Sequence, residues 1–293
     1  AVAADQPALA REVAKKILSG EVEARVAGRA HTLLGQALAC EGHDAEAFEH
    51  YRRAAALIPD DPDPWRAIAR HFSQRGDSGQ ALAALEAGRQ ALSLIAAPDA
   101  APLLADLAAL YEALGRQTEA ITALREACAK APQAADEHRR LGALLRQQGH
   151  EGEAIRVLQR ALQLAPQEAQ TLHELGLALE KAGRLEEALA ALQQSALAQP
   201  QPADPYVDLG RLTLILCRRN SNGCSPLQAI AALTSAVERA PDCAEAHALL
   251  AEARQMAGDA ESALASYERA LQLKPGRVEW SLGFGQVCLD LHQ

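Results

Sequence analysis

The feature that most constrains this 293-residue chain is a small residue that returns at a nearly fixed interval. Four of the six steps between successive members are 34 residues long, and the other two are lengthened to 39 and 41 residues. The members of the series are Ala47, Ala81, Ala120, Ala154, Ala188, Ala229 and Ala263. A period of this length is typical of solenoids, in which each repeat packs on its neighbours. The chain is therefore predicted to form one continuous solenoid, where its length alone would suggest about two globular domains.

One repeat, residues 135–168, illustrates the local physics. Its first half has leucines at helical spacing, and Gly149 ends that helix because glycine accepts the left-handed conformation of a helix stop. Its second half places small, large and small residues on one helix face, at Ala154, Leu158 and Ala161. Pro166 closes the unit, since proline does not extend a helix. Each repeat is therefore predicted to be a pair of helices.

The motif resembles the tetratricopeptide repeat family, whose pattern is W, LG and Y in the first helix and A, F, A and P in the second. One repeat carries it as Trp65, Ile68, Ala69, Phe72, Ala81, Leu85 and Gly88. The next carries it as Leu104, Leu107, Ala108, Tyr111, Ala120, Leu124, Ala127 and Pro132. The resemblance implies an all-α fold, a right-handed superhelical solenoid of stacked antiparallel helix pairs with about seven repeats and terminal capping helices.

The predicted organisation has three parts. Residues 1–27 form an N-terminal capping helix or a degenerate half repeat, and residues 278–293 form a C-terminal capping helix or the start of a further repeat. Seven repeats lie between them, at 28–61, 62–100, 101–134, 135–168, 169–202, 203–243 and 244–277. The extra residues around Leu94 to Asp99 are expected to lengthen one helix and its turn.

Composition and charge limit the classes of molecule that this chain is expected to bind. Hydrophobic residues make up 49% of the chain but aromatic residues only 3%, which predicts a core of alanine and leucine. The net charge of −9 and the lack of a basic run argue against nucleic acid as a partner. No apolar stretch approaches the roughly 18 residues of a membrane span. Proteins are therefore the expected partners.

No motif for catalysis, a metal or a cofactor stands out. The chain lacks a G-x-S-x-G elbow, a P-loop and an H-E-x-x-H motif, so we expect no enzyme activity and no cofactor. Cys40, His43 and His50 bracket the first turn without a recognised metal spacing, and His31 occupies the slot that Trp65 fills elsewhere. These residues are interpreted as a solvated turn and a packing residue.

Cys217 and Cys224 flank an inserted loop in the sixth repeat. A loop of this size closes easily, so the two cysteines are a candidate disulfide. The alternative is two free thiols in a reducing compartment. The sequence leaves both open.

The first helices are expected to line a concave groove, as they do in this family, and the groove is the expected partner site. Helical phase places arginines there in alternation with bands of acids. A partner segment with acidic side chains or a free carboxylate is predicted to lie across the second to fourth repeats and to contact Arg66, Arg70, Arg139 and Arg146. The arginines are Arg66, Arg70, Arg139, Arg146 and Arg211.

A second candidate partner surface lies on the first helix of the sixth repeat, which is apolar on all sides at Leu212, Leu214 and Ile215. A helix of this kind must be covered, either by the inserted loop or by a partner.

The favoured function is a non-catalytic scaffold or adaptor that binds a partner peptide or helix in the groove. Two alternatives remain: the repeat portion of a longer enzyme, such as a transferase, and an exported assembly factor of the bacterial envelope. The chain starts at Ala1 without methionine, which fits either a cleaved leader or a fragment. The compartment accordingly stays open between the cytoplasm and, after signal cleavage, the periplasm.

Overall fold

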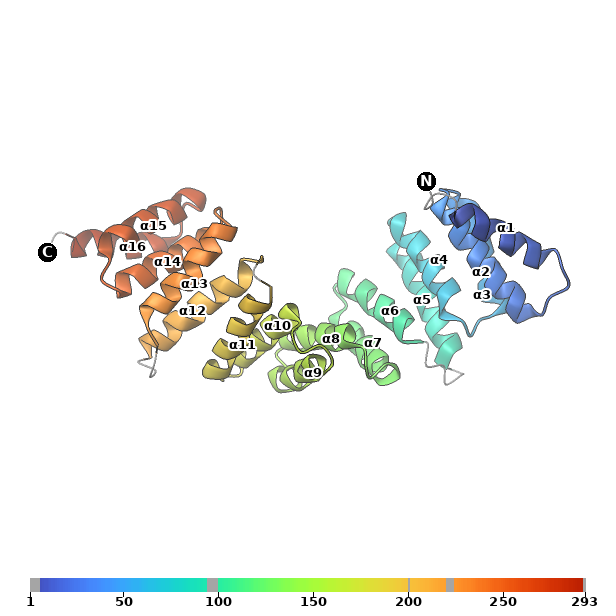
Figure 1. The fold of residues 1–293 in the computed structure, drawn as a ribbon, viewed down its shortest axis with the longest axis horizontal. Helices are drawn as coiled ribbons and strands as arrows, with labels where there is room; N and C mark the ends of the chain where they lie inside the picture. Colours follow the sequence, from blue (N-terminus) through green and yellow to red (C-terminus); the bar gives the residue numbers. More distant parts are fainter. Residues whose placement is uncertain (1–5, 94–99, 200, 220–223, 292–293) are drawn as a thin grey trace. The chain divides into compact units, whose positions relative to one another are not determined.

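A computed structural model describes residues 6–93, 100–199, 201–219 and 224–291. Within these ranges the chain forms sixteen α-helices and no strand (Figure 1). The helices are α1 Gln6–Leu18, α2 Ala24–Cys40, α3 Asp44–Leu57, α4 Pro62–Gln74, α5 Ser78–Ser93, α6 Ala101–Ala113, α7 Gln117–Lys130, α8 Ala135–Gln147, α9 Glu151–Leu164, α10 Ala169–Lys181, α11 Leu185–Ala198, α12 Asp204–Arg218, α13 Pro226–Arg239, α14 Ala244–Met256, α15 Ala260–Leu273 and α16 Val278–Asp290. The all-α prediction is confirmed. The insertion predicted at Leu94 to Asp99 lies outside the described residues.

Proline sets the end of the second helix in most pairs. Helices α3, α7, α9, α13 and α15 each end two residues before a proline. The proline ring clashes with a helical conformation of the preceding residue, which must therefore leave the helix. Ile58, before Pro59, has a φ of −133°, and Ala165, before Pro166, has a φ of −135°. A local steric effect thus ends these helices.

Glycine ends the first helix of the pair. Gly149 has a φ of +78°, so the predicted left-handed stop at this residue is confirmed. The same conformation recurs at the matching turns, at Gly42, Gly76, Gly115, Gly183 and Gly258.

Small residues allow the paired helices to pack closely. The recurring alanines of the 34-residue series are each at most 2% exposed. Gly210 on α12 lies so close to α13 that a Cβ atom added there would be 2.3 Å from Cγ of Leu233. The period seen in the sequence is therefore the period of helix contact.

The described chain divides into two compact units, Ala1–Leu144 and Leu145–Gln293, here called unit 1 and unit 2. Unit 1 holds α1–α7 and most of α8, and unit 2 holds the end of α8 and α9–α16. In unit 1, α2 packs on α3, α4 on α5 and α6 on α7; in unit 2, α10 packs on α11, α12 on α13 and α14 on α15. First helices also contact the next first helix, as α4 does α6 and α12 does α14. Within each unit the contacts are those of stacked helix pairs.

The last helix, α16, packs on α15 through the fully buried Val287, with Trp280 and Phe284 against the same cluster. It has no following helix within the described residues.

Candidate functional site

Acids pair with two of the three predicted groove arginines of unit 1, Arg66 and Arg139. Arg66 on α4 donates from Nε to Oδ2 of Asp106 on α6 over 2.6 Å. Arg139 on α8 is held by Asp136, one turn earlier on the same helix. The adjacent Arg140 reaches Glu112 on α6, with Nη2 and Oε1 2.7 Å apart. The positive and acidic bands seen in the sequence thus partly neutralise one another.

The arginines of unit 2 are also paired. Arg146 Nε lies 2.9 Å from Glu174 Oε2, and both side chains are largely buried. Arg211 on α12 donates to Glu180 on α10 and, over 2.9 Å, to Asp208. The pairs Arg146–Glu174 and Arg211–Glu180 form because the first helices of consecutive repeats lie side by side.

His173 extends this network, with its Nε2 2.8 Å from Asp208 Oδ2. Burial alone raises the pKa of the Asp208 carboxyl, but hydrogen bonds from His173 and Arg211 outweigh burial and hold that pKa below its ordinary value. Asp208 is therefore an ionised partner of both groups.

Arg70 differs from the other four predicted arginines. It is exposed on α4, one turn after Arg66, and the described part of the chain gives it no hydrogen bond or ion pair. Asp106 meets Arg66, whereas Leu110, one turn further along α6, lines the same hollow as Arg70. An apolar residue at that place leaves the Arg70 guanidinium available to a partner.

Two hollows flank Arg70. The larger, about 310 Å³, lies between α4, α5 and α6, and the smaller, about 100 Å³, lies between α2, α3 and α4. The larger has an apolar floor made of Ala69, Leu85, Ala109, Leu110 and Ala113. The smaller is lined in part by Ala47, Tyr51 and Gln74, and Asp44, at the start of α3, brings a carboxyl group to its edge. A cation between two small hollows is suited to hold a segment that combines an acid with apolar side chains.

The apolar helix α12 is covered within unit 2. Leu212 and Leu214 are 0% and 1% exposed, and Ile215 is partly buried. Helices α11, α13 and α14 all contact α12, and Leu214 packs in one cluster with Leu233 and Leu250. Leu212 and Leu214 therefore present no surface to a partner, because neighbouring helices cover α12 on several sides.

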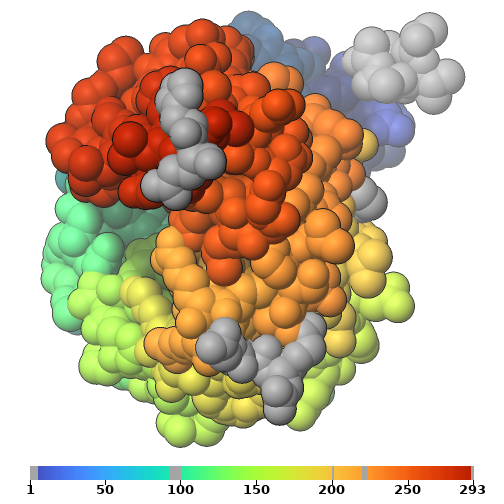
Figure 2. Space-filling view, turned by 90° about the vertical axis from the view of Figure 1, so that its left-hand side faces the viewer, coloured from blue at the N-terminus to red at the C-terminus, as the bar shows by residue number. Residues whose placement is uncertain are grey.

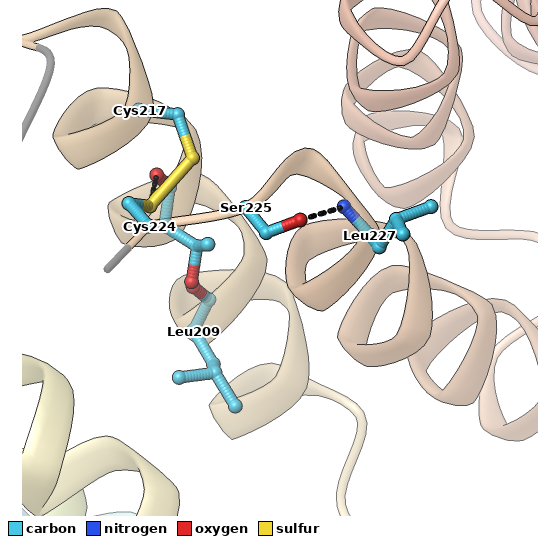
Figure 3. The surroundings of a disulfide bond; sticks show 6 residues. Leu209, Cys217, Cys224, Ser225 and Leu227 are labelled. Atoms are coloured by element: carbon cyan, nitrogen blue, oxygen red, sulfur yellow. Dashed lines mark hydrogen bonds between the residues drawn. A yellow bond between two sulfur atoms is a disulfide. The ribbon is translucent and has the colours of Figure 1, made fainter. Parts of the chain in front are cut away.

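Cys217 at the end of α12 and Cys224 before α13 are joined by a disulfide, with Cα atoms 5.2 Å apart (Figure 3). Cys224 Sγ lies 3.1 Å from the carbonyl oxygen of Thr213, and the Ser225 side chain accepts a hydrogen bond from Leu227 N at the start of α13. The bond ties the two helices at their connection, although residues 220–223 of the inserted loop lie outside the described residues.

The described residues contain no group of three or more His, Cys, Asp or Glu side chains placed to hold a metal ion. His50, one of the residues that bracket the first turn, faces His31. None of the described helices is both long and apolar enough to cross a membrane.

Comparison with known proteins supports the fold. Tetratricopeptide repeat models match residues 28–71, 106–134, 145–210 and 226–278, and no curated protein sequence matches significantly.

Similar solved structures include the C-terminal part of a TPR repeat-containing protein from Cytophaga hutchinsonii, at 17% identity and a TM-score of 0.64 over 85% of this chain and 97% of that chain. PilW, a type IV pilus biogenesis factor, is 20% identical, with a TM-score of 0.59 over 75% of this chain and 97% of that chain. YrrB, a TPR protein with an unusual peptide-binding site, is 22% identical, with a TM-score of 0.55 over 68% and 96% of the two chains. The repeat period, the stacked helix pairs and the four family matches agree: the chain belongs to the tetratricopeptide repeat family.

Proposed function

We propose that this protein is a non-catalytic scaffold that binds an extended segment of a partner protein at the first-helix face of unit 1, around Arg70. The observation that carries the proposal is the exposed Arg70 guanidinium, which has no acidic partner in the described chain and lies between two hollows. A guanidinium holds a carboxylate through two parallel hydrogen bonds. These bonds fix the orientation of the carboxylate in addition to the attraction between the charges. The apolar floor beside it accepts a neighbouring side chain.

The paired arginines have a different role in this proposal. Arg66 neutralises Asp106 on the rim of the larger hollow, so Asp106 does not repel an incoming acid. Arg139, Arg146 and Arg211 contact a partner only after releasing their own acids, so we expect smaller effects when they are replaced. The peptide-binding site named for YrrB, which has the same fold, agrees with the proposed class of ligand.

A displayed library of random dodecapeptides, selected on the whole chain, tests the proposal. We expect enrichment of peptides that carry Asp or Glu, or a free carboxyl end, close to an apolar residue. Arg70→Ala should weaken these peptides about tenfold, because a hydrogen-bonded charge contributes about 1.5 to 3 kcal/mol and exposure reduces that value. The affinity is measured by titration calorimetry at two salt concentrations.

Arg75→Ala is the matched control, since Arg75 is also exposed near the end of α4 but lines neither hollow. It should change affinity less than twofold. Both variants should keep the melting temperature, because neither side chain makes an internal ion pair within the described residues. Selected peptides that bind Arg70→Ala as well as the unaltered chain would contradict the site.

A further inference from the structure

The smaller hollow beside Arg70 is lined by polar side chains that have no partner in the described part of the chain. It lies between α2, α3 and α4, and its polar lining includes Asp44, Tyr51, Arg70 and Gln74. None of these four side chains has a hydrogen bond or an ion pair among the residues that the structure describes. The lining also includes three alanines, Ala39, Ala47 and Ala67.

Tyr51 is the most informative of these side chains, because it is buried while its hydroxyl is unpaired. Only 7% of the residue is exposed, and its ring packs against Gly35 on α2. No fully buried polar side-chain atom of the described residues lacks a hydrogen-bond partner, so this unpaired hydroxyl reaches solvent at the hollow that Tyr51 lines. A polar group of a ligand can therefore bond the hydroxyl without displacing a protein partner.

Arg70 and Asp44 place opposite charges near the Tyr51 hydroxyl. Burial raises the pKa of this hydroxyl above the ordinary 10.0, while Arg70 acts to lower it and Asp44 acts to raise it. Both charges therefore act on one phenol, although they do not pair with each other within the described residues. The hydroxyl is neutral at pH 7, so it can accept a hydrogen bond as well as donate one. The hollow thus offers a carboxylate and a neutral hydroxyl in addition to the Arg70 guanidinium.

A tyrosine at the matching place of the last repeat has different surroundings. Tyr267, like Tyr51, stands four residues after a member of the alanine series. It lines a hollow of about 880 Å³ in unit 2, at the orange and red end of the chain in Figure 2. Burial and Glu252 raise the pKa of Tyr267 and Arg218 lowers it, but Glu252 and Arg218 pair with each other. The charges beside Tyr51 are instead left to a ligand.

A lysine ammonium group matches the polar groups that remain once Arg70 binds an acid. It has three donor hydrogens and no acceptor, whereas the Asp44 carboxylate, the Tyr51 hydroxyl and the Gln74 amide oxygen all accept hydrogen bonds. Its compact end fits a hollow of about 100 Å³, because one water molecule takes about 30 Å³ of liquid volume. The planar guanidinium of an arginine is larger and therefore fits less well.

The place of Arg70 between the two hollows sets the spacing of the ligand. In an extended segment, side chains two residues apart point to the same face. An acid bound to Arg70 therefore directs the residues two before and two after it toward the two hollows. The apolar floor of the larger hollow suits an apolar side chain, and the smaller hollow suits a lysine.

We propose that the partner segment carries a lysine two residues from the acid that Arg70 binds, and that the lysine ammonium enters the smaller hollow to bond Asp44 and Tyr51. An apolar residue, two residues from the acid on its other side, occupies the larger hollow. This inference rests on the proposed function, because Arg70 holds the acid. The lysine also offsets the repulsion between Asp44 and that acid, so it contributes to specificity.

A dodecapeptide library with a fixed central glutamate and all other positions random tests the spacing when it is selected on the whole chain. We expect enrichment of lysine two residues from the glutamate and of an apolar residue two residues away on the other side. Selection on the Asp44→Asn variant should keep the apolar preference and lose the lysine preference.

Titration calorimetry with one selected peptide, and with its analogue that has norleucine in place of the lysine, measures the contact. Asp44→Asn should weaken the lysine peptide about three- to fivefold, as expected for an exposed ion pair, and should not weaken the norleucine analogue. Tyr51→Phe should act in the same direction, because it removes one acceptor and keeps the ring.

Glu46→Gln is the matched control. Glu46 lies in the same first turn of α3 as Asp44 and is exposed, but it lines neither hollow. Its replacement removes the same charge from the same helix end and should change the affinity of both peptides less than about twofold. Circular dichroism should show unchanged helix content in all variants.

Two results would overturn this inference and leave the proposed function standing. The first is a selection that enriches apolar residues near the glutamate without lysine. The second is a lysine peptide that Asp44→Asn binds as tightly as the unaltered chain does. If Arg70→Ala also leaves the affinity unchanged, or if no peptide is enriched, the proposed function is wrong as well.

Discussion

A pair of histidines links α2 to α3 in unit 1. The Nδ1 atoms of His31 and His50 are 2.9 Å apart, and the rings stack with their centres 5.1 Å apart. One Nδ1 donates its hydrogen to the other, so the contact requires at least one neutral ring. Burial, followed for His31 by His50 and for both rings by Arg53, lowers the pKa of each from the ordinary 6.5. Protonation of both rings would therefore oppose this packing.

The sign of the resulting pH effect follows from the lowered pKa values. Between the folded and unfolded pKa, the unfolded chain binds more protons. The contribution of the two histidines to the stability of unit 1 is therefore fully present above pH 6.5 and declines as the pH falls below it. We expect His50→Gln to flatten this decline in urea unfolding at about pH 7.5 and 5.5. An unchanged difference between the two pH values in the variant would show that the histidine pair is not responsible.

At the scale of the element, close packing of a helix pair depends on glycine, which carries a hydrogen atom where every other residue carries a Cβ atom. Gly210 on α12 faces Leu233, whereas Gly152 in the first turn of α9 is exposed and has nothing within 4 Å of an added Cβ atom. The two glycines make a matched pair, because both lie in helices of unit 2 and differ in what they meet.

Gly210→Ala should destabilise unit 2 by up to about 2 kcal/mol. Alanine gains about 1 kcal/mol of helix propensity, but overpacking a tight contact costs about 1 to 3 kcal/mol or more. Gly152→Ala should change stability by less than about 1 kcal/mol, and in the stabilising direction. Urea denaturation measures both, and equal effects would mean that the α12–α13 contact relaxes freely around the new methyl group.

At the scale of the whole molecule, contacts are local, and a disturbance should stay local. In a solenoid each repeat contacts only its neighbours, so stability is a sum of repeat and interface contributions. The Cys217–Cys224 disulfide joins the ends of two consecutive helices in unit 2. It closes a loop with a sequence separation of 7 residues.

Reduction of this disulfide should destabilise unit 2 by about 2 to 3 kcal/mol, because it frees the connecting loop in the unfolded chain. Amide hydrogen exchange should accelerate in α12 and α13 and stay unchanged in α2–α6 of unit 1. A chain with both Cys217→Ser and Cys224→Ser serves as the control, since reductant should not affect its exchange. Faster exchange throughout both units would contradict local stability.

The pairing of helices and many of their ends were predictable from the sequence. Pro166 restricts the backbone of the residue before it, and Gly149 acts through its own positive φ. The alanine series marks contacts between neighbouring helices, so local chemistry is sufficient for these features. The cover over α12 was not predictable in the same way. It comes from three other helices, and an apolar run does not say which neighbours will reach it.

Arg66 and Arg70 show the limit most clearly. They are the same residue type, one turn apart on one face of α4, and the sequence assigned them one role. The tertiary structure separates them, because α6 brings Asp106 within hydrogen-bonding distance of Arg66, whereas no acid of the described residues forms an ion pair with Arg70. An ion pair between residues 40 positions apart depends on the rotation of two packed helices. The repeat period therefore determined that both arginines would line a first-helix face, and only helix packing decided that Arg70 has no acidic partner among the residues that the structure describes.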